Sequence, residues 1–323
     1  AKGTVEVIFR FPGRKLAGKT VVAFETLTKD NKEYAAHHDI TDEGQTVYIP
    51  KIGTSVQDDD TKSHLSHADE EVTLADTVKY ENLVPGKEYV LRGALMDQRS
   101  KKPAVDAQVN EITAQTAFTP AEKNGSVQVT FRFDARELEG KTLVVFEELL
   151  YNGKPAAEHK DMKDEGQTVY FPKIATSASD RETGKKISYA DQKVTIEDAV
   201  QYENLIPGKK YTVQGVLKDQ STGESLLNAE GKEITAQKEF TAESAKGEVT
   251  VGFEFDGSLL AGKTTVAFEE LFMDGKKIAV HGDIRDEAQT VRFPEMQTQA
   301  VNPETGMNLV MAADEITVVD RVT

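Results

Sequence analysis

The chain has 323 residues, of which 38% are apolar and 29% charged, and its formal net charge is -16 at pH 7. This composition is typical of a soluble folded protein, and the negative charge argues against nucleic acid and anionic membrane surfaces as partners. No apolar run is long enough to span a bilayer, so we expect no membrane insertion in this segment. Cysteine is absent, which excludes disulfides and thiolate chemistry.

The sequence repeats itself with a period of 122 residues. The segments HHDITDEGQTV, HKDMKDEGQTV and HGDIRDEAQTV begin at His37, His159 and His281. The same step relates three glutamates, three glutamines, three threonines and three aspartates, which are Glu25, Glu147, Glu269, Gln45, Gln167, Gln289, Thr54, Thr176, Thr298, Asp76, Asp198 and Asp320. A period of this length is too long for a solenoid and suits one domain per repeat.

A proline-containing junction follows each glutamine segment, at Pro50, Pro172 and Pro294. Because proline cannot donate to a strand ladder, we place a domain border at each junction. The sequence therefore predicts two complete domains and two partial ones. The complete domains are residues 51-172 and 173-294, the C-terminal part of a repeat is 1-50, and the N-terminal part of a further repeat is 295-323. We expect the chain to be a window from a longer array.

Within a complete repeat the hydrophobic periodicity is that of β-strands. Apolar and polar residues alternate over 127-133 and again over 249-255, which predicts half-buried strands. Residues 143-146 are apolar at every position and predict a central, covered strand, while 190-200 suit a strand better than a helix. Many short strands separated by turn signals indicate an all-β fold of tandem immunoglobulin-like β-sandwich domains.

The recurring polar residues suggest chemistry, and three hypotheses follow from them. A metal site would use His159, Asp161, Asp164 and Glu165, but each copy offers one histidine among hard oxygen donors. A hydrolase would combine Thr or Ser with His and Asp, but no G-x-S-x-G elbow is present. A polar strand end without chemistry does not explain why four residue types recur in register. We expect no metal and no cofactor.

The motifs taken together resemble one family. They are Val-Ala-Phe-Glu at 22-25 and 266-269, Val-Val-Phe-Glu at 144-147, the three histidine segments, and the I/M-x-T-x-A/V starts. The resemblance covers essentially the whole chain, and it is to the VaFE-repeat, or threonine-glutamine ester-bond, domains of Gram-positive surface adhesins and pilus-like stalks. It implies CnaB-like β-sandwiches with an autocatalytic crosslink. A threonine hydroxyl on the first strand attacks the side-chain amide of a glutamine on the last, and ammonia leaves.

Carried onto this sequence, the resemblance implies that Thr54 joins Gln167 and Thr176 joins Gln289. The residues implied to promote the two bonds are Asp76, Glu147 and His159 in the first domain and Asp198, Glu269 and His281 in the second. Threonine needs a base, for which histidine is the natural choice. A buried protonated glutamic acid can polarise the amide, and an adjacent aspartate would share its proton. Which side chain plays which part stays open at this point.

Two incomplete sets of these residues flank the complete ones. One consists of Glu25, His37 and Gln45, and the other of Thr298 and Asp320. Each lacks its reaction partner within this chain, so we expect both half-sites to be inert. A lysine-asparagine isopeptide bond is the rival crosslink. The lysines nearest the first strand, Lys51 and Lys173, are replaced by Glu295 in the third copy, whereas the threonine is retained, which favours the ester.

The resemblance implies a structural function rather than a turnover enzyme. The chain would be a stalk segment of a Gram-positive cell-surface adhesin, extracellular and anchored to the cell wall, whose crosslinks give mechanical and proteolytic resistance. Its partners would be neighbouring domains of the same stalk, with the host ligand unknown. The alternative is a ligand-binding adhesin module that contacts a host protein or glycan through its loops. With no Trp and 7% aromatic residues, the sequence offers no obvious patch for that role.

Overall fold

The computed structural model describes residues 2-323 and divides the chain into two units, one ending at Lys173 and the other beginning at Ile174. The regular structure is strand, apart from four single-turn 3₁₀ helices. The all-β expectation is therefore confirmed. Among the described residues, no helix is long and apolar enough to cross a membrane.

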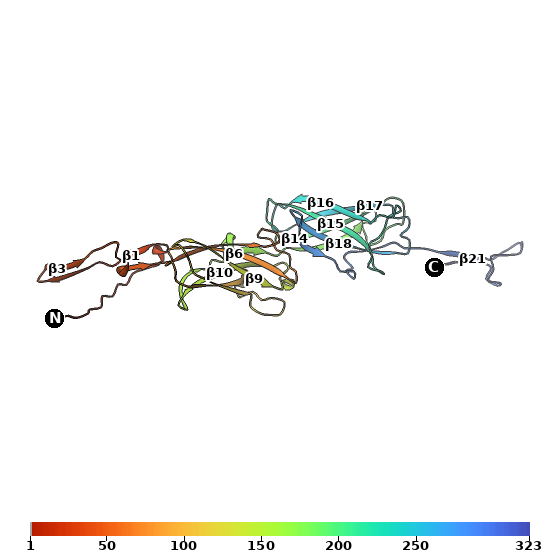
Figure 1. Cartoon of the computed structure of the whole chain (residues 1–323). Helices are drawn as coiled ribbons and strands as arrows, with labels where there is room; N and C mark the ends of the chain where they lie inside the picture. Colours follow the sequence, from red (N-terminus) through yellow and green to blue (C-terminus); the bar gives the residue numbers. More distant parts are fainter. Residues whose placement is uncertain (1) are drawn as a thin grey trace. The chain divides into compact units, whose positions relative to one another are not determined.

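The first complete domain is a sandwich of two antiparallel sheets, strands of which are labelled in Figure 1. A three-stranded sheet has the order β5-β6-β9, formed by β5 (Lys51–Asp58), β6 (Val72–Glu81) and β9 (Gly125–Phe133). A five-stranded sheet has the order β11-β10-β7-β8, with β12 also paired to β10. Its strands are β7 (Tyr89–Asp97), β8 (Thr113–Phe118), β10 (Thr142–Tyr151), β11 (Lys154–His159) and β12 (Thr168–Tyr170).

The core of this domain lies between the two sheets. Phe131 from β9 and Leu74 from β6 are fully buried and belong to the same cluster as Leu91 from β7 and Val145 from β10. Every second residue of β9 is buried from Val129 onward, as its alternation predicted. The apolar run 143-146 lies in β10, which is flanked by neighbours on both sides, so its prediction as a central covered strand is also confirmed.

The second complete domain repeats this topology. Its three-stranded sheet has the order β13-β14-β17, formed by β13 (Lys173–Asp180), β14 (Val194–Glu203) and β17 (Gly247–Phe255). Its five-stranded sheet consists of β15 (Lys210–Asp219), β16 (Thr235–Thr241), β18 (Thr264–Met273), β19 (Lys276–His281) and β20 (Thr290–Arg292). The predicted strand in the range 190-200 is β14, which begins four residues later than the start of that range.

The partial repeats form only short strand pairs. Near the N-terminus, β1 (Thr20–Val22) pairs with β4 (Thr46–Tyr48), and β2 (Glu25–Lys29) pairs with β3 (Lys32–His37). Toward the C-terminus, β21 (Thr298–Val301) pairs with β22 (Val319–Val322).

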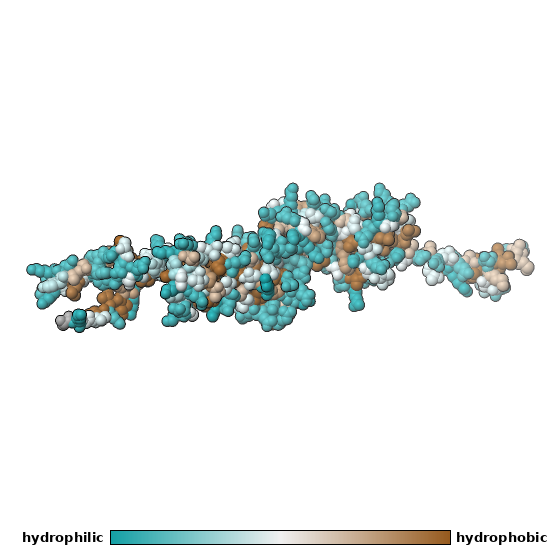
Figure 2. Space-filling model, viewed as in Figure 1, coloured by the Kyte–Doolittle hydropathy of each residue, from teal (hydrophilic) through white to brown (hydrophobic). Residues whose placement is uncertain are grey.

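Residues 4-11 carry the same apolar alternation as β9 but form no strand. Their large side chains, which are Val5, Val7, Ile8, Phe9 and Phe11, are exposed. They contribute to the hydrophobic colour near the N-terminus in Figure 2. In the complete domain the matching strand is paired with β6, and no described residue takes that place here.

Candidate functional site

The threonine and glutamine of each complete domain come from different sheets. Thr54 lies on β5 of the three-stranded sheet, and Gln167 ends the 3₁₀ turn η4 (Glu165–Gln167), directly before β12 of the five-stranded sheet. The turn is formed locally, because the Asp164 side chain accepts a hydrogen bond from the backbone N–H of Gly166 at 2.8 Å. The turn packs beside β5, since a Cβ on Gly166 would lie 3.8 Å from the carbonyl oxygen of Thr54.

Two carboxyl groups are buried between the sheets at this point. Asp76 from β6 and Glu147 from β10 each have 0% exposed surface. Burial and the nearby charge of Asp76 raise the pKa of Glu147 to about 9. Burial raises the pKa of Asp76 to about 7, against the lowering effects of the neighbouring Glu147 carboxyl and of the charge of His159. Glu147 is therefore protonated at neutral pH and able to share its proton with Asp76.

A glycine makes room for this carboxyl group. Gly93 on β7 is the cross-strand partner of Glu147, and a Cβ there would come within 2.4 Å of both Glu147 Oε1 and the Phe131 ring. In the second domain Gly215 lies 122 residues further on and faces Phe253 in the same way, at 2.5 Å. Any larger residue at this position would displace the acid or the core ring.

The histidine lies beside the carboxyl pair and is itself held by an aspartate. His159 ends β11 as the cross-strand partner of Glu147, and its Nε2 lies 2.6 Å from Asp164 Oδ2. The histidine side chain is 24% exposed and that of Asp164 29% exposed. An aspartate at Nε2 favours the tautomer with a proton on that nitrogen and fixes the orientation of the ring.

In the second domain the two candidate reactants converge on one oxygen. Thr176 Oγ1 donates to Glu269 Oε2 at 3.2 Å, and Gln289 Nε2 donates to the same oxygen at 3.2 Å. Asp198 completes the carboxyl pair, and burial together with the nearby charge of Asp198 raises the pKa of Glu269 well above its ordinary value. His281 pairs with Asp286 at 2.7 Å, as His159 does with Asp164.

The first domain holds the same groups in a looser arrangement. Gln167 Nε2 donates to Asp76 Oδ1 at 3.4 Å, and Thr54 Oγ1 is buried without a hydrogen-bond partner. The structure thus places the predicted residues of each domain around one buried carboxyl pair, and the threonine contacts that pair through a hydrogen bond in the second domain.

Unsatisfied buried polar atoms mark the same two places. Over residues 2-323, the buried side-chain nitrogen and oxygen atoms that lack a hydrogen-bond partner all belong to the two clusters. They are found in Thr54, Asp76, Glu147, Gln167, Asp198, Glu269 and Gln289. Folded proteins seldom leave such atoms unpaired, and where they do the site usually has a function.

The flanking half-sites are exposed or half-buried, although the N-terminal one keeps the local pairing of glutamate, histidine and aspartate. Glu25 and His37 are cross-strand partners, and His37 Nε2 lies 2.6 Å from Asp42 Oδ2. The His37 side chain is 52% exposed, and Gln45 is only half-buried. At the other end Thr298 and Asp320 lie on paired strands and are exposed. That these half-sites are inert stays a prediction.

The geometry does not support the metal-site hypothesis or the isopeptide hypothesis. Asp161 does not share a strand face with His159, because β11 ends at His159 and Asp161 instead accepts a hydrogen bond from the backbone of Lys163 in the following turn. No group of three or more His, Cys, Asp or Glu in the described part of the chain is arranged to hold a metal ion. Lys51 and Lys173 are exposed, with salt bridges to surface glutamates, so neither is directed at a buried amide.

A comparison with family models matches the sequence to a known domain. The family model described as "T-Q ester bond containing domain" matches residues 1-49, 50-171 and 172-293. The chain belongs to this family. The T-Q in its description names the residue types that the structure brings together in each complete domain.

Solved structures resemble this T-Q ester bond protein only at low similarity. A bacterial adhesin from Mobiluncus mulieris containing intramolecular disulfide, isopeptide and ester bond cross-links is 16% identical, with TM-scores of 0.33 and 0.32 in two space groups. The alignments cover 84% of this chain and 92% and 93% of that one. A glycosyl hydrolase family 2 member from Bacteroides cellulosilyticus has a TM-score of 0.26 at 11% identity, over 65% of this chain and 28% of that one. The search of curated proteins found no match.

Two kinds of residue shape the site although the sequence did not predict a role for them in crosslinking. Asp164 and Asp286 hold the histidines, although the sequence suggested Asp164 only as a metal ligand. The sequence feature that identifies these aspartates is the second Asp of the H-x-D-x-x-D-E pattern, which recurs in all three copies. Gly93 and Gly215 also recur at the repeat period, but only the packing against Glu147 and the core rings gives the reason.

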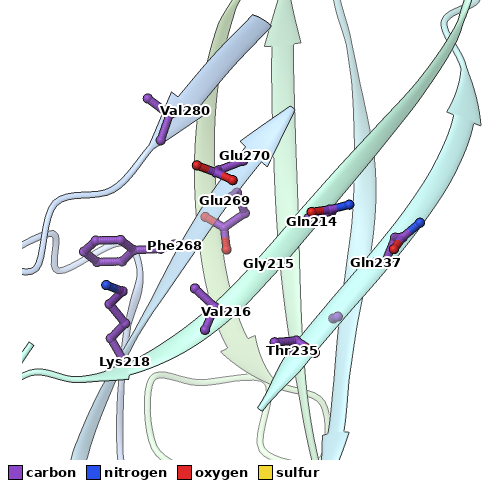
Figure 3. A pocket seen from close by; sticks show the side chains of 11 residues that line it. Gln214, Gly215, Val216, Lys218, Thr235, Gln237, Phe268, Glu269, Glu270 and Val280 are labelled. Carbon is purple, nitrogen blue, oxygen red and sulfur yellow. The ribbon is translucent and has the colours of Figure 1, made fainter. Parts of the chain in front are cut away.

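Each domain also has an open groove on the outer face of its five-stranded sheet. In the second domain its volume is about 560 Å³, and Figure 3 shows Phe268 and Val280 on one side and Gln214 and Gln237 on the other. The ammonium group of Lys218 lies 4.8 Å from the centre of the Phe268 ring. The first domain has a matching groove of about 780 Å³. This concave surface is the feature to test for a bound ligand.

Proposed function

We propose that each complete domain forms an intramolecular ester between its threonine and its glutamine, and that the chain is a stalk segment of a bacterial surface adhesin. The observation that carries the proposal is the convergence of Thr176 and Gln289 on Glu269 Oε2. One oxygen touches the hydroxyl that must lose a proton and the nitrogen that must gain one. That is the geometry required for transfer of an acyl group from an amide to an alcohol.

The chemistry follows from those contacts. Thr176 Oγ1 attacks Cδ of Gln289 while its proton passes to Glu269 Oε2, and Glu269 gives up to Asp198 the proton that the two carboxyl groups shared. The C–N bond then breaks, and the leaving nitrogen takes the proton from Oε2 and departs as ammonia. Glu269 regains the shared proton, and the products are one ester and one ammonia. His281 stabilises the ionised Asp198 by its charge when protonated.

This reaction occurs once per domain, so the chain would not be a turnover enzyme. The site has no place from which the ester product could leave, because both reactants are parts of the same domain. The contribution of the bond is mechanical. In the first domain Thr54 lies on the three-stranded sheet near the entry of the chain and Gln167 lies directly before β12 of the five-stranded sheet near its exit, so an ester would carry tension directly between them. It would also close a loop of about 114 residues, which adds roughly 4 to 5 kcal/mol by the chain-entropy model.

The contact between residues 1-50 and the following domain supports an array of docked repeats. Asn82, at the end of β6, is 7% exposed and donates to the carbonyl oxygens of Lys19 at 2.7 Å and Ile49 at 3.3 Å. Its Oδ1 accepts from Thr20 Oγ1 at 3.0 Å. We propose that neighbouring domains of the stalk are the partners of each repeat, in an extracellular protein anchored to the Gram-positive cell wall.

Force spectroscopy on single molecules tests the proposal. A crosslinked domain cannot release the chain between Thr54 and Gln167, so about 400 Å of extension should be missing from its unfolding event. The control is the Thr54→Ala, Thr176→Ala double variant, in which both domains should extend fully. Full extension of both domains in the natural sequence would contradict the proposal. A binding screen of the same chain against glycans and host matrix proteins addresses the alternative, ligand-binding role of the grooves.

A further inference from the structure

Among the positions beside the crosslinking site at which the two complete domains differ, one carries a cation in the second domain only. Lys186 of the second domain stands 122 residues after His64 of the first. The backbone is the same at both, because the carbonyl oxygen of Lys186 accepts from Arg292 N–H at 2.9 Å and that of His64 accepts from Tyr170 N–H at 2.8 Å. A parallel β-bridge follows in each domain. The difference is therefore confined to the side chain.

The Lys186 ammonium joins the two segments that carry the reactants. It donates to Ser177 Oγ at 3.1 Å and to the carbonyl oxygens of Ala178 and Ala288. Ser177 directly follows Thr176 on β13, and Ala288 directly precedes Gln289. One cation thus bridges the neighbours of both reacting residues, and a bond from Ala178 N–H to the Ala288 carbonyl at 3.0 Å lies in the same place.

His64 makes no such bridge in the first domain. Its hydrogen bond joins Nδ1 to the carbonyl oxygen of Thr168 at 3.0 Å, on the glutamine side alone. The reactants of the two domains differ accordingly. Thr176 and Gln289 share one carboxyl oxygen, whereas Thr54 Oγ1 has no hydrogen-bond partner and Gln167 donates to Asp76 at 3.4 Å.

Charge strengthens the Lys186 bridge. Burial lowers the pKa of Lys186, while the charges of Asp198 of the carboxyl pair and Asp286 of the histidine pair oppose this and favour the charged ammonium. Hydrogen bonds from an ammonium group to carbonyl oxygens are stronger than those between neutral groups. Lysine can therefore hold the two segments together against their thermal motion, and proximity of this kind raises the rate of an intramolecular reaction.

We propose that Lys186 is a positioning residue that holds Thr176 and Gln289 in reach of each other, so that residues 173-294 crosslink faster than residues 51-172. The inference rests on the proposed ester reaction. It adds that one side chain outside the set of reacting groups makes the two domains of one molecule react at different rates.

Time-resolved crosslinking of the whole chain tests this. The chain is synthesised in a cell-free extract with a short pulse of labelled amino acid and quenched in acidic denaturant at intervals. It is then digested, so that the linked Thr176–Gln289 and Thr54–Gln167 peptides are quantified from the same molecules. Lys186→Met should slow the second bond about tenfold, the size expected for losing a charge-assisted contact, and leave the first unchanged. Lys186→Arg should keep most of the natural rate because the cation is retained.

Several outcomes would overturn the inference. They are equal rates for the two natural domains, an unchanged second rate in Lys186→Met, or a Lys186→Arg rate as low as that of Lys186→Met. If Lys186→Met fails to fold, His64→Lys in the first domain serves instead and should raise the first rate; an unchanged rate there counts against the proposal. A natural chain with neither crosslink would refute the ester reaction itself, and this inference with it.

Discussion

Thr176 and Gln289 are 113 residues apart in sequence, and both donate a hydrogen bond of 3.2 Å to Oε2 of Glu269. Glu269 is fully buried and comes from a third element, β18. Because its raised pKa keeps a proton on the carboxyl pair, Oε2 can exchange protons between the two donors without a net charge entering the core. This relationship leads to five measurable expectations.

The intact mass of the purified, unfolded chain should fall short of the sequence mass by two ammonia molecules, one for each complete domain. The half-sites at the two ends contribute nothing, because their partners are absent from this chain. Electrospray mass spectrometry measures the deficit directly. A deficit of zero would exclude the crosslinks, and a deficit of three would show that a half-site had found a partner.

Replacing Glu147 should abolish the first bond and leave the second in place. Glu147→Ala removes the group that we propose relays the proton, while the core residues of both sheets are unchanged. The domain should still fold and should melt at a lower temperature, since it loses the roughly 4 to 5 kcal/mol that the closed loop adds. Mass mapping and calorimetry give the two readouts. Glu147→Gln, which keeps the volume, is the matched variant, and a full mass deficit in either would reject the assigned role.

Removing the aspartate that holds the histidine should slow the first bond without preventing it. Asp164→Asn keeps an oxygen for the Gly166 N–H but removes the negative charge 2.6 Å from His159 Nε2. His159 then loses the carboxylate that orients its ring beside Asp76, and we expect a slowing of about tenfold or more. The time course of ammonia release measures it. Asp42→Asn, in the exposed half-site, is the control and should change nothing.

Stability without the crosslink should fall as the pH rises. In a Thr54→Ala, Thr176→Ala background, Asp76 and Glu147 have ordinary pKa values of 3.8 and 4.5 in the unfolded chain and raised values of about 7 and about 9 in the folded domain. The folded state therefore binds more protons between these values, and the free energy of unfolding decreases from about pH 4 to about pH 9. Urea unfolding at pH 5, 7 and 9 measures this decrease in the free energy of unfolding. Adding Glu147→Gln and Glu269→Gln should flatten the dependence, and an equal slope with and without them would contradict the shifts.

Hydroxylamine distinguishes an ester from an isopeptide, which lose the same ammonia. An ester carbonyl lacks the nitrogen resonance that makes an amide unreactive, so in denaturant at mildly alkaline pH it should be cut while peptide bonds survive. The product should be a hydroxamate on the peptide that carries Gln167 or Gln289, with Thr54 or Thr176 freed. In the folded domain the buried ester should resist cleavage by hydroxylamine. Crosslinked peptides that survive the denaturing treatment would mean an amide, and a lysine would have to be its donor.

Local features of the site form between residues that are close in the sequence, and the sequence predicted the identity of the glutamate and histidine, though not their pairing or the histidine-aspartate contact. The hairpin that pairs a glutamate with a histidine forms in all three copies, and the histidine-aspartate distance is 2.6 Å, 2.6 Å and 2.7 Å. The copy at residues 25-45 keeps this geometry although most of its domain is absent from this chain. The strand alternation, the repeat period and the identity of the candidate residues are information of the same kind.

Burial was decided only by the tertiary structure. Residues 4-11 have the alternation of β9 and no strand, because a strand needs hydrogen-bonding partners from elsewhere in the chain. His37 is 52% exposed where His159 is 24% exposed, and the sequences around them are nearly the same. The raised pKa of Glu147 arises first from the loss of water between the sheets and then from the charge of Asp76, which is 71 residues away on the opposite sheet. Desolvation and charge pairing depend on segments that only folding brings together, so the same motif is a reaction site inside the sandwich and a surface hairpin outside it.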